Sequence, residues 1–405
     1  MTLSIFILIF AIVAADGTPP SRPQTLLFVR EPLTKYAAFI DGLKTQLHHH
    51  VIVSSQREEL VKFGERAFDN LIIFDSNDDV YSVSKLLDFV DLGGNILVAN
   101  DKPGKFSKAL ANKCGFDFDE QNTFVTSEAN SLDSLHKMVA VPSHNAINID
   151  VNGKPVAFRG IGQAQSQLTW TEKSFPVLTG DLFIYSFDPT QKSVETAGQE
   201  LILIGALQAF NDARITLIGS SDMFSDELFA VESCANEEFT LRLAAWSFGQ
   251  MGRLKASNIY HHRIDKGQDS ISPKQYTVND TVVYHVSIHQ FDGFTNQWKP
   301  FVTDDLQLEF VMMDPYVRIP LKLVSPGDYS VVFTVPDVYG VFKFRIEYDR
   351  LGFSKLSSST VVPVHPKRHD EYERFIDRAF PYYVAEFSIM IGFMLFAGVY
   401  LYHKD

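Results

Sequence analysis

Both ends of the chain are apolar, and the second apolar run is long enough to cross a membrane. From Phe380 to Tyr402 the only charged side chain is that of Glu386, and a helix of this length exceeds the roughly 20 residues that a bilayer core requires. Aromatic rings favour the headgroup level, and they lie near both rims: Phe380, Tyr382, Tyr383, Tyr400 and Tyr402. We therefore predict a transmembrane helix over 380–402, a juxtamembrane segment over 367–379 and a short tail over 403–405.

The first apolar run is shorter and has the form of a secretory signal. Leu3 to Ala15 has the length of a signal-peptide hydrophobic region, and Val13 and Ala15 suit cleavage before Asp16. An uncleaved N-terminal anchor stays open as an alternative. Basic and acidic residues are balanced beside the C-terminal run, so the orientation rests on the signal at 1–15. It predicts a type I protein with residues 16–380 on the luminal or exterior side.

Charge and cysteine content argue against several classes of function. The formal net charge is −13, and the sequence has no block or stripe of lysine and arginine, so nucleic acid is not an expected partner. Cys114 and Cys234 are the only cysteines, and they lack the CxxC spacing of zinc and redox sites. One disulfide is allowed in an oxidising compartment but is not required. We expect no cofactor and no metal.

Residues 16–250 have the pattern of an α/β domain. Short apolar runs such as Leu71–Phe74 alternate with helix-period stretches up to Gly115, which predicts a parallel sheet with helices on both faces. One expected helix covers 56–64, and another ends at Gly93-Gly94. Strands over 201–207 and 214–219, followed by a helix through 241–248, are expected to return to this sheet. Residues near 120–200 have the composition of a β-rich insertion.

The pattern changes after residue 250. We interpret 251–273, which is polar, as a connection between domains. Over 274–366, period-two strands alternate with turn residues, which predicts an antiparallel sandwich of immunoglobulin type. The expected strands cover 276–290, 306–312, 327–334, 341–348 and 357–364.

Polar residues follow the expected strands at their carboxyl ends, where an α/β enzyme carries its active site. They are Asp75, Asn100, Asp101, Ser220, Ser221 and Asp222. The Ser220-Ser221 pair lacks the GxSxG spacing of a nucleophile elbow, and no histidine follows it until His261. Helix capping by Ser221 or Asp222 is therefore the favoured interpretation over a nucleophilic serine.

Two groups of adjacent histidines, 48–50 and 261–262, invite a metal interpretation. Neighbours in an extended chain point to opposite faces, so adjacent histidines seldom share one ion. Solvated or hydrogen-bonded imidazoles are the simpler expectation.

Two further features concern the membrane and the lumen. Ala385, Ser388 and Gly392 share one face of the expected transmembrane helix, and small residues at such spacing allow close packing against other helices. Small residues in a simple lipid-facing anchor explain the same spacing. Asn279-Asp280-Thr281 is an N-glycosylation sequon.

Several ordered motifs resemble the family of 48-kDa subunits of the oligosaccharyltransferase complex, or dolichyl-diphosphooligosaccharide–protein glycosyltransferase. The resemblance runs from end to end. It is carried by the ranges 70–74, 158–160, 207–209, 224–226, 261–263, 308–311, 336–342 and 372–375.

The resemblance implies a single-span, non-catalytic accessory subunit in the endoplasmic reticulum membrane. Its complex transfers a lipid-linked oligosaccharide to asparagine in N-x-S/T sequons, and catalysis belongs to a separate multi-span subunit. That subunit and small membrane subunits are the implied partners. A weak contact with glycan or nascent chain through Asp75, Asn100, Asp101 and Asp222 is a further hypothesis. Some relatives end in a dilysine retrieval signal, but this chain ends His403-Lys404-Asp405, so retention is expected to depend on assembly.

Two other classes stay open from the residues alone. A membrane-tethered luminal hydrolase would use the region of Ser221, and a type I adhesion or receptor protein would use the sandwich beside the membrane. Neither accounts for the motifs.

Overall fold

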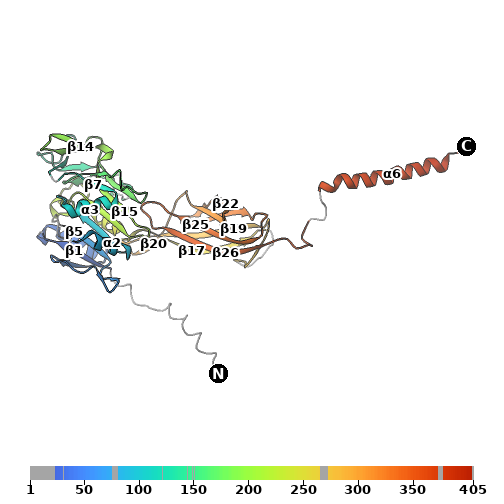
Figure 1. The fold of residues 1–405 in the computed structure, drawn as a ribbon, viewed down its shortest axis with the longest axis horizontal. Helices are drawn as coiled ribbons and strands as arrows, with labels where there is room; N and C mark the ends of the chain where they lie inside the picture. Colours follow the sequence, from blue (N-terminus) through green and yellow to red (C-terminus); the bar gives the residue numbers. More distant parts are fainter. Residues whose placement is uncertain are drawn as a thin grey trace, which may run out of the picture.

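The computed structural model describes residues 23–30, 32–74, 81–120, 122–143, 145–147, 149, 151–264, 272–372 and 377–403. The expected signal peptide at 1–15 and Asp75 lie outside these residues. Figure 1 shows a mixed α/β unit at one end, a β-rich unit in the middle and helix α6 at the other end. The chain is thus a mixed α/β protein with several sheets and one apolar C-terminal helix.

The first unit is organised by one nine-stranded sheet. Its order is β2-β1-β5-β6-β16-β15-β11-β7, and β12 pairs with β15. The first five strands in this order are parallel, whereas β15 runs antiparallel to β16, and β11, β7 and β12 extend that antiparallel part. The strands are β1 (Gln24–Val29), β2 (His50–Ser54), β5 (Asn70–Phe74), β6 (Asn95–Ala99), β7 (Phe116–Phe118), β11 (Gln163–Gln165), β12 (Ser174–Thr179), β15 (Ile202–Gln208) and β16 (Arg214–Ile218).

Helices cover both faces of this sheet. Successive residues of each central strand point to opposite faces and pack into two separate hydrophobic cores. Leu27, Ile72 and Leu97 pack into one core with α1 (Ala37–Thr45) and α5 (Asn236–Ser247). Their neighbours Leu26, Leu71 and Ile96 pack into another core with α2 (Val83–Asp91) and α3 (Lys105–Cys114). Strands buried on both faces lose the polar alternation of a half-exposed sheet. Short helices complete the unit: η1 (Leu33–Tyr36), η2 (Gly198–Glu200), η3 (Asp222–Phe224) and α4 (Asp226–Phe229).

The helix expected over 56–64 is wrong. This stretch contains strand β3 (Val61–Lys62), which pairs with β4 (Glu65–Arg66) in a hairpin. Phe63 and Gly64 at its tip both have positive φ, 53° and 82°. Two such residues in succession make the tight turn that joins twisted strands, and a helix cannot contain them.

The segment near 120–200 is rich in β-structure. It holds the three-stranded sheet β14-β13-β8 and the pair β10-β9, while β11 and β12 join the main sheet. The strands are β8 (Phe124–Thr126), β9 (Val139–Val141), β10 (Val156–Phe158), β13 (Tyr185–Asp188) and β14 (Ser193–Ala197). Cys114 and Cys234 are both buried and free, so the disulfide that the sequence allows is not formed here.

The second unit contains two five-stranded sheets around one core rich in Phe and Tyr. One has the order β17-β19-β24-β23 with β20 paired to β19, and the other has the order β18-β26-β25-β21-β22. The strands are β17 (Met251–Arg263), β18 (Tyr276–Thr277), β19 (Thr281–Asp292), β20 (Gln297–Pro300), β21 (Gln307–Val311), β22 (Pro315–Pro320), β23 (Lys322–Ser325), β24 (Asp328–Thr334), β25 (Gly340–Tyr348) and β26 (Leu356–His365).

The connection expected over 251–273 is wrong for its first half. Residues 251–263 form β17, which pairs with β19 along most of its length. Polar residues here occupy positions of a strand with one open face, and that pattern resembles a linker in sequence. Beyond the second unit, η4 (Asp377–Ala379) leads into α6 (Phe380–Tyr402), whose bounds agree with the sequence expectation.

Candidate functional site

The structure brings Asn100, Asp101 and Asp222 together at the carboxyl ends of β6 and β16. Asp101 accepts hydrogen bonds from the backbone N–H of Ser221 and from its hydroxyl, the latter at 2.8 Å. The hydroxyl of Ser220 donates to the carbonyl oxygen of Arg159 at 2.6 Å. Asn100 is buried and donates to the hydroxyl of Ser107. Each serine of the Ser220-Ser221 pair therefore connects neighbouring segments, and neither hydroxyl is bonded to a histidine among the described residues.

Asp222 is the centre of an ion-pair network. Lys35 Nζ lies 2.8 Å from one of its oxygens and Arg159 Nε lies 2.7 Å from the other, while Arg159 also pairs with Glu227 at 2.9 Å. Burial opposes the charge of Asp222, but the hydrogen bonds from Lys35 and Arg159 hold its pKa below the usual value. Burial and the nearby charge of Asp222 raise the pKa of Asp101. Two neighbouring carboxyl groups, one with a raised pKa and one with a lowered pKa, occur both in catalytic pairs and in structural networks.

The chain itself covers this edge of the sheet. The segment after β10 crosses the end of β16, where Ile161 N–H donates to Gly219 O at 2.8 Å. A Cβ atom on Gly160 would lie 2.1 Å from that same oxygen, so only glycine fits the crossing. With its carboxylates paired and the strand ends crossed, the cluster has the character of a structural network.

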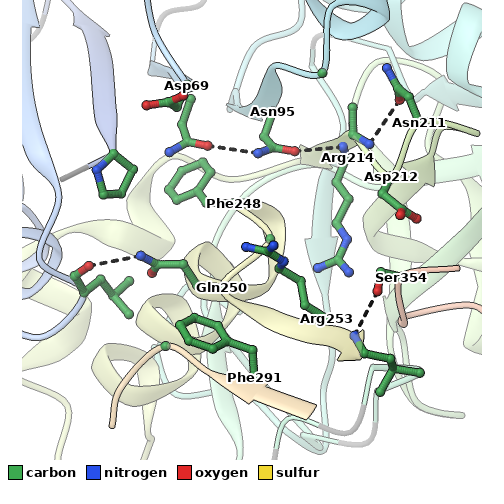
Figure 2. Close-up of a pocket in the computed structure, with 18 of the residues that line it drawn as sticks. Asp69, Asn95, Asn211, Asp212, Arg214, Phe248, Gln250, Arg253, Phe291 and Ser354 are labelled. Carbon is green, nitrogen blue, oxygen red and sulfur yellow. Dashed lines mark hydrogen bonds between the residues drawn. The ribbon is translucent and has the colours of Figure 1, made fainter. Parts of the chain in front are cut away.

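A cavity of about 1050 Å³ lies at the opposite edge, at the amino ends of the parallel strands. Figure 2 shows its lining, which combines residues that precede β5, β6 and β16 with residues of the second unit such as Arg253, Phe291 and Ser354. Its charged residues are Arg66, Asp69, Asp212, Arg214, Arg253 and Lys355. This cavity has no signature in the sequence, because its residues come from eight separate stretches of the chain.

Beside the cavity, Arg214 and Trp246 form contacts that connect the two units. The guanidinium carbon of Arg214 lies 4.5 Å from the Trp246 ring centroid, and its Nη1 donates to the carbonyl oxygens of Trp246 and Met251. The indole N–H of Trp246 donates to Gly352 O in the second unit at 2.8 Å. Burial lowers the pKa of Arg214 to about 10, which still leaves the side chain charged at neutral pH. Backbone carbonyls and the ring face thus compensate a buried cation that makes no ion pair with a carboxylate in the described part of the chain.

The segment between β25 and β26 completes this junction. Ser354 N–H donates to Gly252 O at 2.7 Å, and its hydroxyl accepts from Leu254 N–H at 2.9 Å. Gly252 has a φ of 75°, and a Cβ there would lie 2.3 Å from Gly352 O. Lys173 adds an ion pair to Asp349 at 2.5 Å. These contacts fix the segment to the start of β17 within the second unit, with no room for a side chain at Gly252, and the Lys173–Asp349 ion pair links the segment to the first unit.

Helix α6 is long and apolar enough to span a membrane. The candidate span covers Asp377–Tyr402, and an 18-residue stretch within it has a mean hydropathy of 1.9 and is not buried against the rest of the described chain. Ala385, Ser388 and Gly392 are all exposed, and the Ser388 hydroxyl donates to Ala385 O at 2.8 Å. This internal bond satisfies the hydroxyl in a setting without water. A Cβ on Gly392 would meet nothing within 4 Å.

Comparisons with known proteins agree along the whole length. A family model described as "OST48, N-terminal domain" matches residues 20–250, and one described as "OST48 middle domain" matches residues 261–404. The chain belongs to the OST48 family.

Curated relatives of this OST48 chain support the assignment over similar spans. The proteins named dolichyl-diphosphooligosaccharide–protein glycosyltransferase 48 kDa subunit from Drosophila melanogaster and Danio rerio are each 36% identical, covering 85% of this chain and 83% of the relative. The one from Arabidopsis thaliana is 36% identical over 96% of this chain and 95% of its own length. The solved mmIFT52 N-terminal domain, at 14% identity and a TM-score of 0.41 over 55% of this chain, is too distant to define the fold.

One histidine of each adjacent group, His49 and His261, is buried and hydrogen-bonded in this OST48 chain. His49 is buried, with its Nδ1 2.6 Å from the Thr25 hydroxyl, and His261 Nδ1 lies 2.6 Å from the Tyr276 hydroxyl. Burial lowers the pKa of both imidazoles. Among the described residues, no group of three or more His, Cys, Asp and Glu side chains is placed to hold a metal ion.

Asn279 lies in the turn between β18 and β19 and is exposed, with a φ of 65°. Its neighbour Asp280 pairs with Arg263 at 3.0 Å, which fixes the turn. The sequon thus presents its asparagine outward on an ordered turn.

Proposed function

We propose that this OST48 chain is a non-catalytic accessory subunit of the oligosaccharyltransferase, the complex that transfers a lipid-linked oligosaccharide to Asn of N-x-S/T sequons. The observation that carries the proposal is the pair of family matches over residues 20–250 and 261–404. The catalytic residues belong to another, multi-span subunit. The covered strand ends and the paired carboxylates of the carboxyl-end cluster support this division of labour.

The chain is a type I protein of the endoplasmic reticulum membrane, with its bulk in the lumen. We take residues 16–250 as the first luminal domain and 274–366, extended by β17, as the second; the family models match residues 20–250 and 261–404. The two packed sheets around one core support an immunoglobulin-type sandwich. Retention in the endoplasmic reticulum follows from assembly with partners.

The structural role is that of a rigid spacer on a membrane anchor. The junction of Arg214, Trp246 and Gly352 holds the first unit at a fixed angle on the sandwich, and α6 carries both. On α6, the face of Ala385, Ser388 and Gly392 packs against helices of the other membrane subunits. Their small side chains support the close helix approach that this packing needs.

The glycan contact at the carboxyl-end cluster is a narrower proposal. Asn100 supports it, because its Oδ1 is buried without a hydrogen-bond partner among the described residues. Asp101 and Asp222 would act through their neighbours Ser221 and Arg159. Asn100→Ala should weaken glycan transfer at limiting donor, and unchanged transfer would remove the cluster from consideration.

Affinity purification in mild detergent tests the main proposal. The tagged chain should bring down the multi-span catalytic subunit and the small membrane subunits, and its depletion should lower sequon occupancy in secreted reporters. A matched type I protein with the same signal and a polyleucine span serves as the control. Purification of the chain alone, with normal occupancy after depletion, would contradict the proposal.

A further inference from the structure

The cavity between the two units carries an excess of positive charge. Its charged lining residues comprise four cationic and two acidic side chains, although the chain as a whole has a net charge of −13. Both acidic residues are already engaged. Asp69 pairs with Arg66 at 3.2 Å and accepts from Gln24 N–H at 2.9 Å, while Asp212 accepts from Lys355 N–H at 3.0 Å.

Besides the buried Arg214, two cationic groups of the lining make no ion pair with a carboxylate of the described residues. Arg253 and Lys355 are exposed into the cavity, and the described residues offer no ion-pair partner to either side chain. The charge of Arg253 also acts on the buried guanidinium of Arg214. Figure 2 shows the two guanidinium groups near the middle of the view, with Asp69 and Asp212 toward its edge. Like charges side by side in a concave site favour an anion between them.

The remaining lining suits the body of a small molecule. Phe248 and Phe291 provide ring surface, and Asn95, Asn211 and Gln250 provide amides. The volume of about 1050 Å³ is slightly above the range of roughly 300–1,000 Å³ for small-molecule sites. Arginine binds phosphate and carboxylate groups through two parallel N–H donors, and lysine adds a point charge.

We propose that this cavity binds a small molecule that carries an oxyanion, held by Arg253 and Lys355. The shared chemistry of the ligand is a phosphate or carboxylate group. Because the site contains residues from both units, its occupant also bridges them. The site is independent of the carboxyl-end cluster, which lies at the other edge of the sheet.

Arginine labelling of the detergent-purified complex tests the proposal at one residue. The complex is treated with phenylglyoxal in phosphate-free buffer, and modification of Arg253 is followed by peptide mass spectrometry. Arg318, which is 58% exposed and paired with Glu309 on the sandwich surface, serves as the internal reference. Inorganic pyrophosphate and citrate are titrated as the phosphate and carboxylate arms, against NaCl at matched ionic strength.

We expect saturable protection of Arg253, but not of Arg318, by at least one of the two anions, and the effective arm identifies the oxyanion. Lys355→Gln should raise the half-protecting concentration about tenfold, as expected when one charged contact is lost. The matched variant Lys343→Gln, which removes an exposed charge on β25 away from the cavity, should stay within about twofold. No protection beyond that of NaCl, or equal protection of Arg318, would overturn the proposal. Complete shielding of Arg253 without any anion would overturn it too, because another protein would then fill the cavity.

Discussion

The contacts at the junction between the two units predict that Trp246→Phe destabilises the protein much more than Trp298→Phe does. Trp246→Phe removes the indole N–H that donates to Gly352 O and shrinks the ring that faces Arg214. The lost hydrogen bond costs about 1 kcal/mol. The weaker cation–π contact costs about 0.5–1 kcal/mol, and the gap in a site where Trp246 is 1% exposed adds about 1 kcal/mol. The sum is a loss of about 2.5–3 kcal/mol in the free energy of unfolding.

Trp298→Phe is the matched control. Trp298 is 40% exposed and lies 5.3 Å from the Phe291 ring, so its substitution should cost no more than about 0.5 kcal/mol. A domain of 150–250 residues shifts its Tm by about 2–4 °C per kcal/mol. Thermal unfolding of the full chain in detergent should therefore show a loss of about 5–10 °C for Trp246→Phe and less than about 2 °C for Trp298→Phe.

Hydrogen exchange locates the effect. In Trp246→Phe, the backbone amides of 349–355 should exchange faster, since this segment lies against Trp246 and Gly252. A Tm for Trp246→Phe within 1–2 °C of the Trp298→Phe value would refute the reasoning, because the indole bond and the cation–π contact would then contribute little.

Four further predictions concern the strand ends, the membrane helix and the sequon. Asp222→Asn should lower the free energy of unfolding by about 1–2 kcal/mol at pH 7, because two cations lose their partner. Folding lowers the pKa of the Asp222 carboxyl below 3.8, so the stability difference between wild type and Asp222→Asn should shrink as the pH falls below 3.8 in denaturation curves. Asp101→Asn should be neutral or stabilising at pH 7, because the raised pKa of Asp101 means that its charge destabilises the fold as the pH rises; a loss equal to that of Asp222→Asn would contradict the assignment. Gly392→Leu should reduce co-purification of membrane partners, whereas Gly398→Leu, on another face of α6, should not, and equal effects would argue against a packing face. Asn279→Gln should abolish an endoglycosidase-sensitive mobility shift of the chain; an unchanged shift would place the glycan elsewhere.

Elements with a strong apolar pattern were predictable from sequence because burial alone determines them. Leu71–Phe74 is apolar throughout and lies within β5, and the span from Phe380 to Tyr402 matches α6. The stretch 56–64 was mispredicted, because two consecutive positive-φ residues override a weak helix period. The residues of β17 resemble a linker in sequence because many of them are polar, although they lie on the open face of a strand. Cross-strand pairing, which determined β17, is not visible in a single segment.

The carboxyl-end cluster and the cavity also differ in how far they can be predicted from the sequence. The carboxyl-end cluster was predictable because parallel strands place their ends along one edge. Its ion pairs were not, since Lys35 and Arg159 are far from Asp222 in sequence. The cavity was missed for the same reason: its cations come one at a time from distant stretches, and no local run of lysine and arginine marks it.

Glycan transfer by separated components is the most direct test of the central claim. The purified chain, the complete complex and the complex stripped of this chain are each given lipid-linked oligosaccharide and a sequon peptide, and transfer is measured. We predict no transfer by the chain alone, full transfer by the complex, and reduced transfer by the stripped complex that recovers when the chain is added back. Transfer by the isolated chain, or full activity of the stripped complex, would contradict the account.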